Sequence, residues 1–76
     1  MSLTPSQCRA GRALLNWTQA DLAGRAGVAI NTVKFFEMGK RTPQRANREI
    51  LRETMEAAGV DFIDRDNGGP GARLRA

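Results

Sequence analysis

The apolar residues of this chain recur at helical spacing in four stretches. Residues 4–7, Thr-Pro-Ser-Gln, are typical of a helix start. Threonine caps a helix, proline suits the first helical position, and glutamine three residues after the cap completes a capping box. This helix is predicted to run to about residue 15, with Cys8, Arg12 and Leu15 on one face.

Two shorter helices are predicted next, joined by a tight turn. Thr18 is a cap for a helix that ends near residue 26, and Asp21 is a weaker partner in its capping box. Gly27 follows as the left-handed turn residue, because glycine takes positive φ without a steric penalty. The next helix is predicted from residue 29 or 30 to residue 38, and Gly39 ends it.

Small and apolar residues in these two helices fall where a pair of crossing helices needs them. This arrangement is the sequence form of a helix-turn-helix, whose second helix enters the major groove of DNA. The residues predicted to point inward or to allow close crossing are Leu22, Ala23, Ala26, Val28, Val33 and Phe36.

The last part of the chain predicts a fourth helix and a short extended segment. Thr42-Pro43 repeats the Thr-Pro helix start, and Gly59 ends the helix. Residues 60–64 and 72–75 are predicted either to pair as a β-hairpin or, for the last eight residues, to form a frayed tail. The predicted fold is all-α, with a domain over 1–59 and an extended segment over 60–76 as a candidate dimerisation element. The apolar stripe of the fourth helix is Ile50, Leu51, Met55 and Ala58.

Size and composition exclude several kinds of chemistry. A chain of 76 residues is expected to form one domain, and it has no apolar run near 20 residues that would span a membrane. It has no histidine and one cysteine, Cys8, so we expect no disulfide, no metal site, no cofactor and no enzyme activity based on histidine. The first residues lack the pattern of a signal peptide, which predicts a cytoplasmic protein, nucleoid-associated when bound to DNA.

The charge is unevenly distributed along the chain. Residues 1–48 contain eight basic and two acidic residues, a net charge of +6, whereas residues 49–66 contain six acids and two arginines, a net charge of −4. A basic body with an acidic far end favours a polyanionic partner on one side. The alternative is ordinary surface charge.

Residues 18–43, TQADLAGRAGVAINTVKFFEMGKRTP, resemble the lambda-repressor-like helix-turn-helix family of the Cro/C1, or xenobiotic-response-element (XRE), type. The family's run of Thr-Gln, Leu-Ala, Gly-Val, Glu and Gly-Lys-Arg-Thr-Pro is present here in order and spacing. With the flanking helices, the resemblance covers about residues 4–62. It implies a four-helix domain and a small bacterial transcriptional regulator whose partner is double-stranded DNA.

The resemblance maps base readout onto Ile30, Asn31, Lys34 and Phe35. Asn31 is suited to adenine, and Lys34 to guanine or a phosphate, whereas Ile30 and Phe35 are suited to thymine methyl groups. The alternatives are a local hydrogen bond at the helix start for Asn31 and a solvated charge for Lys34. For Phe35 they are a core position or contact with a protein partner.

Phosphate contacts are predicted at helix starts and in the basic loop after Gly39. Gln19 begins the second helix, where free N–H groups can hold a phosphate, and in the family it also braces the recognition helix. Ala29 departs from the family, which usually has a capping Ser or Thr there, and loss of such a cap costs about 1 kcal/mol. The predicted phosphate set is Thr18, Gln19, Ala29, Thr32, Lys40, Arg41, Thr42 and Arg45.

Two further structural roles are predicted. Arg12 and Glu37 match a buried ion pair in the family, although two exposed charges are the alternative. Trp17 is expected in the core rather than as a base-stacking residue.

The function predicted from these observations is a repressor that binds a palindromic operator as a homodimer. Phe62, Ile63 and Leu74 are the candidate dimer contacts, through strand pairing across a twofold axis. The alternatives are a protein-interaction module, such as an antitoxin or adaptor with the same fold, and a transcriptional activator.

Overall fold

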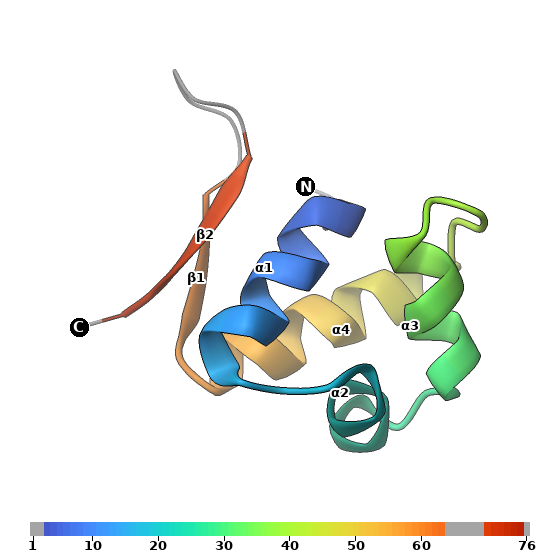
Figure 1. The fold of residues 1–76 in the computed structure, drawn as a ribbon, viewed down its shortest axis with the longest axis horizontal. Coiled ribbons are helices and arrows are strands. Elements are labelled where there is room, and N and C mark those ends of the chain that lie inside the picture. Colours follow the sequence, from blue (N-terminus) through green and yellow to red (C-terminus); the bar gives the residue numbers. More distant parts are fainter. Residues whose placement is uncertain (1–2, 64–69, 76) are drawn as a thin grey trace.

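The helices are arranged as a bundle with a β-hairpin laid against one end (Figure 1). The structure is a computed structural model that describes residues 3–63 and 70–75. In these residues the elements are α1 (Pro5–Leu15), α2 (Gln19–Ala26), α3 (Ile30–Glu37), α4 (Arg45–Ala57), β1 (Val60–Ile63) and β2 (Gly71–Leu74).

The first two helices begin with the capping boxes that the sequence predicts. The Thr4 hydroxyl accepts a hydrogen bond from the Gln7 N–H at 3.1 Å, and the Gln7 side chain accepts one from the Thr4 N–H at 3.0 Å. Thr18 and Asp21 exchange the equivalent bonds at the start of α2. Gly27 has a φ of 72° at the turn between α2 and α3, which confirms its predicted left-handed conformation.

The predicted start of α4 is wrong. The helix begins at Arg45, with Gln44 as its N-cap, rather than at Thr42-Pro43. The N–H groups of Lys40 and Arg41 both donate to the Phe35 carbonyl, at 2.9 and 3.3 Å, and hold the loop against the end of α3. Residues 42–44 connect this loop to the first turn of α4.

The core lies between the helices and under the hairpin. Leu22, Ala23, Val33 and Phe36 are buried as predicted, and Ala26 and Val28 pack against them half-buried. The predicted stripe of α4 is only partly correct, because Leu51 and Met55 are buried but Ile50 and Ala58 are exposed. The other buried apolar residues are Leu3, Cys8, Val60 and Phe62.

Trp17 packs half-buried against the core, as expected. The guanidinium of Arg25 lies 4.5 Å from the centroid of its ring.

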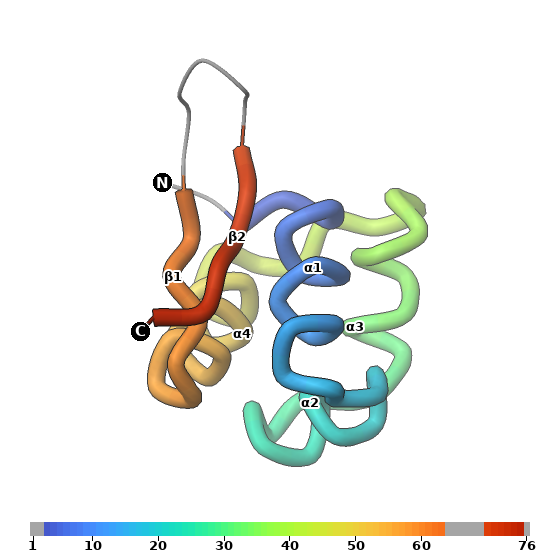
Figure 2. Tube along the Cα trace, turned by 60° about the vertical axis from the view of Figure 1, so that its left-hand side comes forward, coloured from blue at the N-terminus to red at the C-terminus, as the bar shows by residue number. Residues whose placement is uncertain are grey.

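The C-terminal strands form an antiparallel hairpin with Val60 opposite Leu74 and Ile63 opposite Gly71. This confirms the hairpin over a frayed tail for the described residues; residue 64, the predicted end of the first strand, lies outside them. Figures 1 and 2 show the hairpin against α1 and α4, at the end of the molecule opposite α3. No described helix is long and apolar enough to cross a membrane.

Candidate nucleic-acid interface

The outward face of α3 carries the side chains predicted to read bases. Val33, Phe36 and Glu37 are buried, and this leaves the opposite side of the helix to solvent. Ile30 is 47% exposed, Asn31 and Lys34 are also exposed, and Phe35 is half-buried. These four side chains therefore share one surface of a helix whose other side is fixed in the core.

A groove of about 270 Å³ runs between α3 and the start of α4. The groove brings predicted base-reading side chains together with predicted phosphate contacts. It also includes Pro43 and Asn47, which the sequence analysis did not place in the site. Asn47 was missed because α4 starts later than predicted, which places this residue in the first turn of the helix. The lining residues are Asn31, Thr32, Phe35, Arg41, Thr42, Pro43 and Asn47.

Phe35 is neither a core residue nor an isolated exposed ring. The guanidinium of Arg41 lies 5.3 Å from the centroid of the Phe35 ring, within the range of a cation–π interaction. The Arg41 N–H also donates to the Phe35 carbonyl. The basic loop and the outward face of α3 are thus joined at this pair.

The remaining predicted phosphate contacts lie at helix starts or in exposed loops. The Thr18 hydroxyl is already used in its capping box, and Ala29 caps α3 without any side-chain hydrogen bond. Lys40 and Thr42 are exposed. Arg45 is exposed and forms an ion pair with Glu49 at 3.1 Å.

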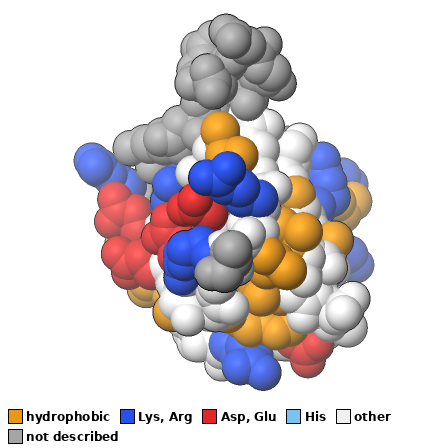
Figure 3. Space-filling view, turned by 90° about the vertical axis from the view of Figure 1, so that its left-hand side faces the viewer, with side chains coloured by type: hydrophobic (Ala, Val, Ile, Leu, Met, Phe, Trp, Pro, Cys, Tyr) orange, Lys and Arg blue, Asp and Glu red, His pale blue; other side chains and the backbone are white. Residues whose placement is uncertain are grey.

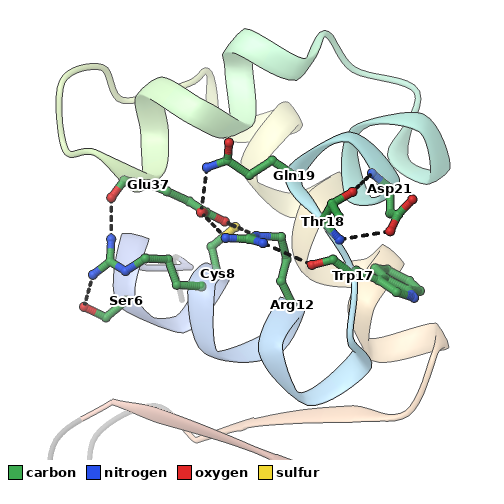
Figure 4. A network of polar contacts seen from close by, with 9 residues as sticks. Ser6, Cys8, Arg12, Trp17, Thr18, Gln19, Asp21 and Glu37 are labelled. Carbon is green, nitrogen blue, oxygen red and sulfur yellow. Dashed lines mark hydrogen bonds and ion pairs between the residues drawn. The ribbon is translucent and has the colours of Figure 1, made fainter.

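Glu37 connects α3 to the two preceding helices (Figure 4). The Nε and Nη2 atoms of Arg12 donate to its two carboxylate oxygens, each at 2.7 Å. Gln19 donates to the same carboxylate at 3.0 Å, and the Cys8 thiol donates at 3.1 Å. Arg9 donates to the Glu37 backbone carbonyl. The end of α3 is therefore fixed by side chains from α1 and α2.

These contacts set the ionisation of the buried groups. Burial raises the pKa of Glu37, but the hydrogen bonds from Arg12, Gln19 and Cys8 outweigh it, so the pKa falls below its ordinary value. Hydrogen bonding to Glu37 raises the pKa of Arg12. Burial, with Glu37 as the next cause, raises the pKa of the Cys8 thiol, which stays protonated as a donor. At neutral pH the cluster is an ionised carboxylate surrounded by donors.

The model of the helix-turn-helix family matches residues 9–47, more than half of the chain and all of α2 and α3. The chain belongs to the Cro/C1-type helix-turn-helix family. This is a family of DNA-binding transcriptional regulators and not a family of enzymes. No curated protein matches the chain.

In this helix-turn-helix protein the hairpin residues differ in how far they are open to a partner. Phe62, one of the three predicted dimer contacts, is only 8% exposed and packs in the core of its own chain, so little of its side chain is open to a partner. Ile63 is half-buried. Leu74 is 49% exposed, so its side chain is open to contact with a partner.

No group of three or more His, Cys, Asp or Glu side chains lies close enough to hold a metal ion among residues 3–63 and 70–75.

Proposed function

We propose that the protein is a sequence-specific transcriptional repressor that binds a palindromic operator in double-stranded DNA as a homodimer. The observation that carries this proposal is the outward face of α3, which presents Ile30, Asn31, Lys34 and Phe35 beside the basic loop. A helix with this exposure, on a family fold that binds DNA, is suited to the major groove.

The side chains of the proposed interface divide into those that read DNA bases and those that bind the phosphate backbone of DNA. Asn31 is exposed at the first turn of α3 and can bind adenine N6 and N7 through its amide. Ile30 and the edge of Phe35 supply apolar contacts for thymine methyl groups. Lys40, Arg41 and Thr42 supply charge and hydrogen bonds to phosphates, which set register but carry no sequence information.

The Glu37 cluster supports this role by fixing the orientation of α3. Direct readout needs side chains held to a fraction of an ångström. Hydrogen bonds from Arg12 and Gln19 to Glu37 tie the end of α3 to α1 and α2. Gln19 thus braces the recognition helix from the first residue of α2.

Repression requires only that the protein occupies its operator and excludes other proteins from it. A twofold dimer of such a domain reads two inverted half-sites about one DNA turn apart. The operator is therefore expected to be a palindrome.

Selection from a random duplex library, followed by sequencing of the bound DNA, tests the proposal. The expected result is a palindromic motif with a defined half-site spacing. Asn31→Ala is expected to relax the base preference within each half-site, because it removes one bidentate contact worth about 1–3 kcal/mol. Arg41→Ala is expected to weaken binding to all duplexes alike.

Two outcomes would overturn the proposal. One is the absence of any duplex binding at low salt. The other is an indistinguishable effect of the two substitutions across a set of operator variants, which would contradict the division between base and phosphate contacts. Fusion of the operator to a reporter promoter then separates repression from activation by the sign of the change.

A protein-interaction module is the second candidate. The observation in its favour is the exposure of two apolar side chains at opposite ends of α3, Ile30 at 47% and Met38 at 52%. Capture of one partner protein that Ile30→Gln abolishes, without a DNA shift in low salt, would select this function.

A further inference from the structure

The surface that α3 turns to solvent carries two large apolar side chains. Ile30, in the first turn, is 47% exposed, and Phe35 is half-buried in the groove between α3 and the basic loop. The opposite side of the helix is held in the core by Val33 and Phe36, which are at most 3% exposed. The rotation of α3 about its axis is therefore fixed, and so are the directions in which Ile30 and Phe35 leave the helix.

The Phe35 ring is also held from the side of the loop. The Arg41 guanidinium lies 5.3 Å from the centroid of the ring, and the N–H groups of Lys40 and Arg41 donate to the Phe35 carbonyl. Because the ring and the backbone of this residue are bound to the same loop, the ring loses little freedom when it meets a ligand. An apolar group in a fixed position is suited to a small apolar target in the major groove, such as a methyl group.

The outward face of α3 and the loop that follows it offer no free carboxylate. The amino group at C4 of cytosine is a hydrogen-bond donor, which proteins recognise with Asp or Glu. Residues 30–44, all of which the structure describes, contain one acid, Glu37, and it is 5% exposed with its carboxylate bonded to Arg12 and Gln19. Acidic side chains gather instead on the hairpin side (Figure 3), at the end of the molecule opposite α3 (Figure 1).

The polar groups on this surface do not separate cytosine from thymine. Thymine has the acceptor O4 where cytosine has the donor N4. The Asn31 amide and the Thr32 hydroxyl can each donate or accept, so either base satisfies them. Lys34 only donates, but its exposed side chain is equally suited to guanine or a phosphate. The feature of thymine that this surface can distinguish is therefore its C5-methyl group.

We propose that Ile30 and Phe35 recognise the C5-methyl group of a pyrimidine, so that 5-methylcytosine takes the place of thymine in the operator. The methyl group of 5-methylcytosine is attached at the same ring atom and occupies the same position in the major groove. Methylation of an operator cytosine at a contacted position then strengthens binding of the protein. This inference rests on the proposed function, and it adds the methylation state of the DNA as the regulator of that site.

Four duplexes that differ at one base pair test the proposal. Each thymine of the selected half-site is replaced in turn, which gives T·A, U·A, 5-methylcytosine·G and C·G at that position. The affinity ratio of thymine to uracil, and that of 5-methylcytosine to cytosine, each measure the methyl group alone, because the group at C4 and the paired purine are constant within each ratio. Both ratios are expected to be about fourfold at a contacted pair, the value for burying one methyl group.

Two results with these duplexes would overturn the proposal. One is a thymine-to-uracil ratio of one at every thymine of the half-site. The other is a gain from the methyl group of thymine without a corresponding gain from that of 5-methylcytosine, which would show that the contact requires the T·A pair.

Substitutions connect the effect to the side chains of α3. Ile30→Ala is expected to reduce both ratios to about one at the base pair that Ile30 contacts, and Phe35→Ala to do so at a different pair. Ile50→Ala is the matched control, because Ile50 is also an exposed isoleucine, at 39%, and lies on α4 outside the predicted interface. It is expected to leave both ratios unchanged. Melting temperatures show that the variants are folded, and wild-type ratios in both folded α3 variants would refute the proposal.

Unmodified DNA separates this inference from the proposed function. A wild-type protein that binds no duplex at low salt would refute both. A wild-type protein that selects a palindromic motif from unmodified DNA, with all methyl ratios at one, would keep the DNA-binding function and refute the recognition of methyl groups alone.

Discussion

Glu37 lies on α3, yet its carboxylate accepts hydrogen bonds from Arg12 and Cys8 on α1 and from Gln19 on α2. The residue is only 5% exposed, so its charge is stabilised almost entirely by these donors. Removing one partner from a buried pair costs more than forming the pair gains, because the remaining charge stays desolvated. Glu37 is therefore the residue whose loss should matter most for the orientation of α3.

The first prediction concerns the stability effect of this residue. Glu37→Gln is expected to lower the free energy of unfolding by about 3–5 kcal/mol at pH 7, since it leaves Arg12 without its anion. The pKa of Glu37 is lowered in the folded protein, so its stabilising effect is present above the ordinary value of 4.5 and is lost as the pH falls through the lowered pKa. The difference between wild type and variant should thus narrow on acidification.

Urea denaturation over a pH series measures both effects. Glu49→Gln is the control, because Glu49 belongs to an exposed pair with Arg45 and should cost about 0–1 kcal/mol. A similar loss for the two variants, or a constant difference down to low pH, would contradict the role assigned to Glu37.

At the scale of the elements, the contact of α1 with α4 and β1 depends on a residue without a side chain. A Cβ atom at Gly11 would lie 2.8 Å from the Met55 sulfur and 3.0 Å from Cζ of Phe62. Both of these side chains are buried, so neither can move away freely. Gly24, in α2, has open space around the same position.

The second prediction follows from this contrast. Gly11→Ala is expected to destabilise the protein by about 1–3 kcal/mol through overpacking. Gly24→Ala should stabilise it by about 0.5–1 kcal/mol, because alanine favours the helix and meets no neighbour. Thermal unfolding of the two variants distinguishes them by sign, and a stabilising Gly11→Ala would show that α1 is not closely packed against the hairpin.

At the scale of the whole molecule, the predicted DNA face and the hairpin lie at opposite ends, and their charges differ. The basic loop contains Lys40 and Arg41, both exposed, close to the outward face of α3. At the other end, Arg73 is paired with Asp61. Under the proposed function, Lys40 and Arg41 contact DNA phosphates and release counterions, whereas Arg73 does not.

The third prediction uses the salt dependence of duplex binding. Arg41→Ala is expected to reduce the slope of log affinity against log salt concentration by about 0.9, the value for one lost phosphate contact. Arg73→Ala removes the same charge from the hairpin and is expected to leave the slope unchanged. Fluorescence anisotropy at several salt concentrations measures both slopes, and equal slopes for the two variants would place DNA elsewhere on the surface.

Local signals in the sequence were sufficient to predict where most of the helices begin and end. The capping boxes at Thr4 and Thr18 and the turn at Gly27 involve residues no more than four positions apart, so their geometry follows from nearby atoms alone. The family motif carried the same information for the two-helix unit and for its DNA-binding class. Helical periodicity predicted which side chains of α3 point outward, whereas their assignment to base readout came from the family resemblance and stays a prediction.

Features that depend on contacts between distant parts of the chain could be determined only from the tertiary structure. The start of α4 depends on the hydrogen bonds of the loop to Phe35, and the burial of Phe62 depends on the space that Gly11 leaves on α1. The docking of the hairpin depends on Gln7, which the sequence marked only as part of a helix cap. These contacts span up to 64 positions, and no local pattern encodes them because the free energy of each arises only when separate elements pack together.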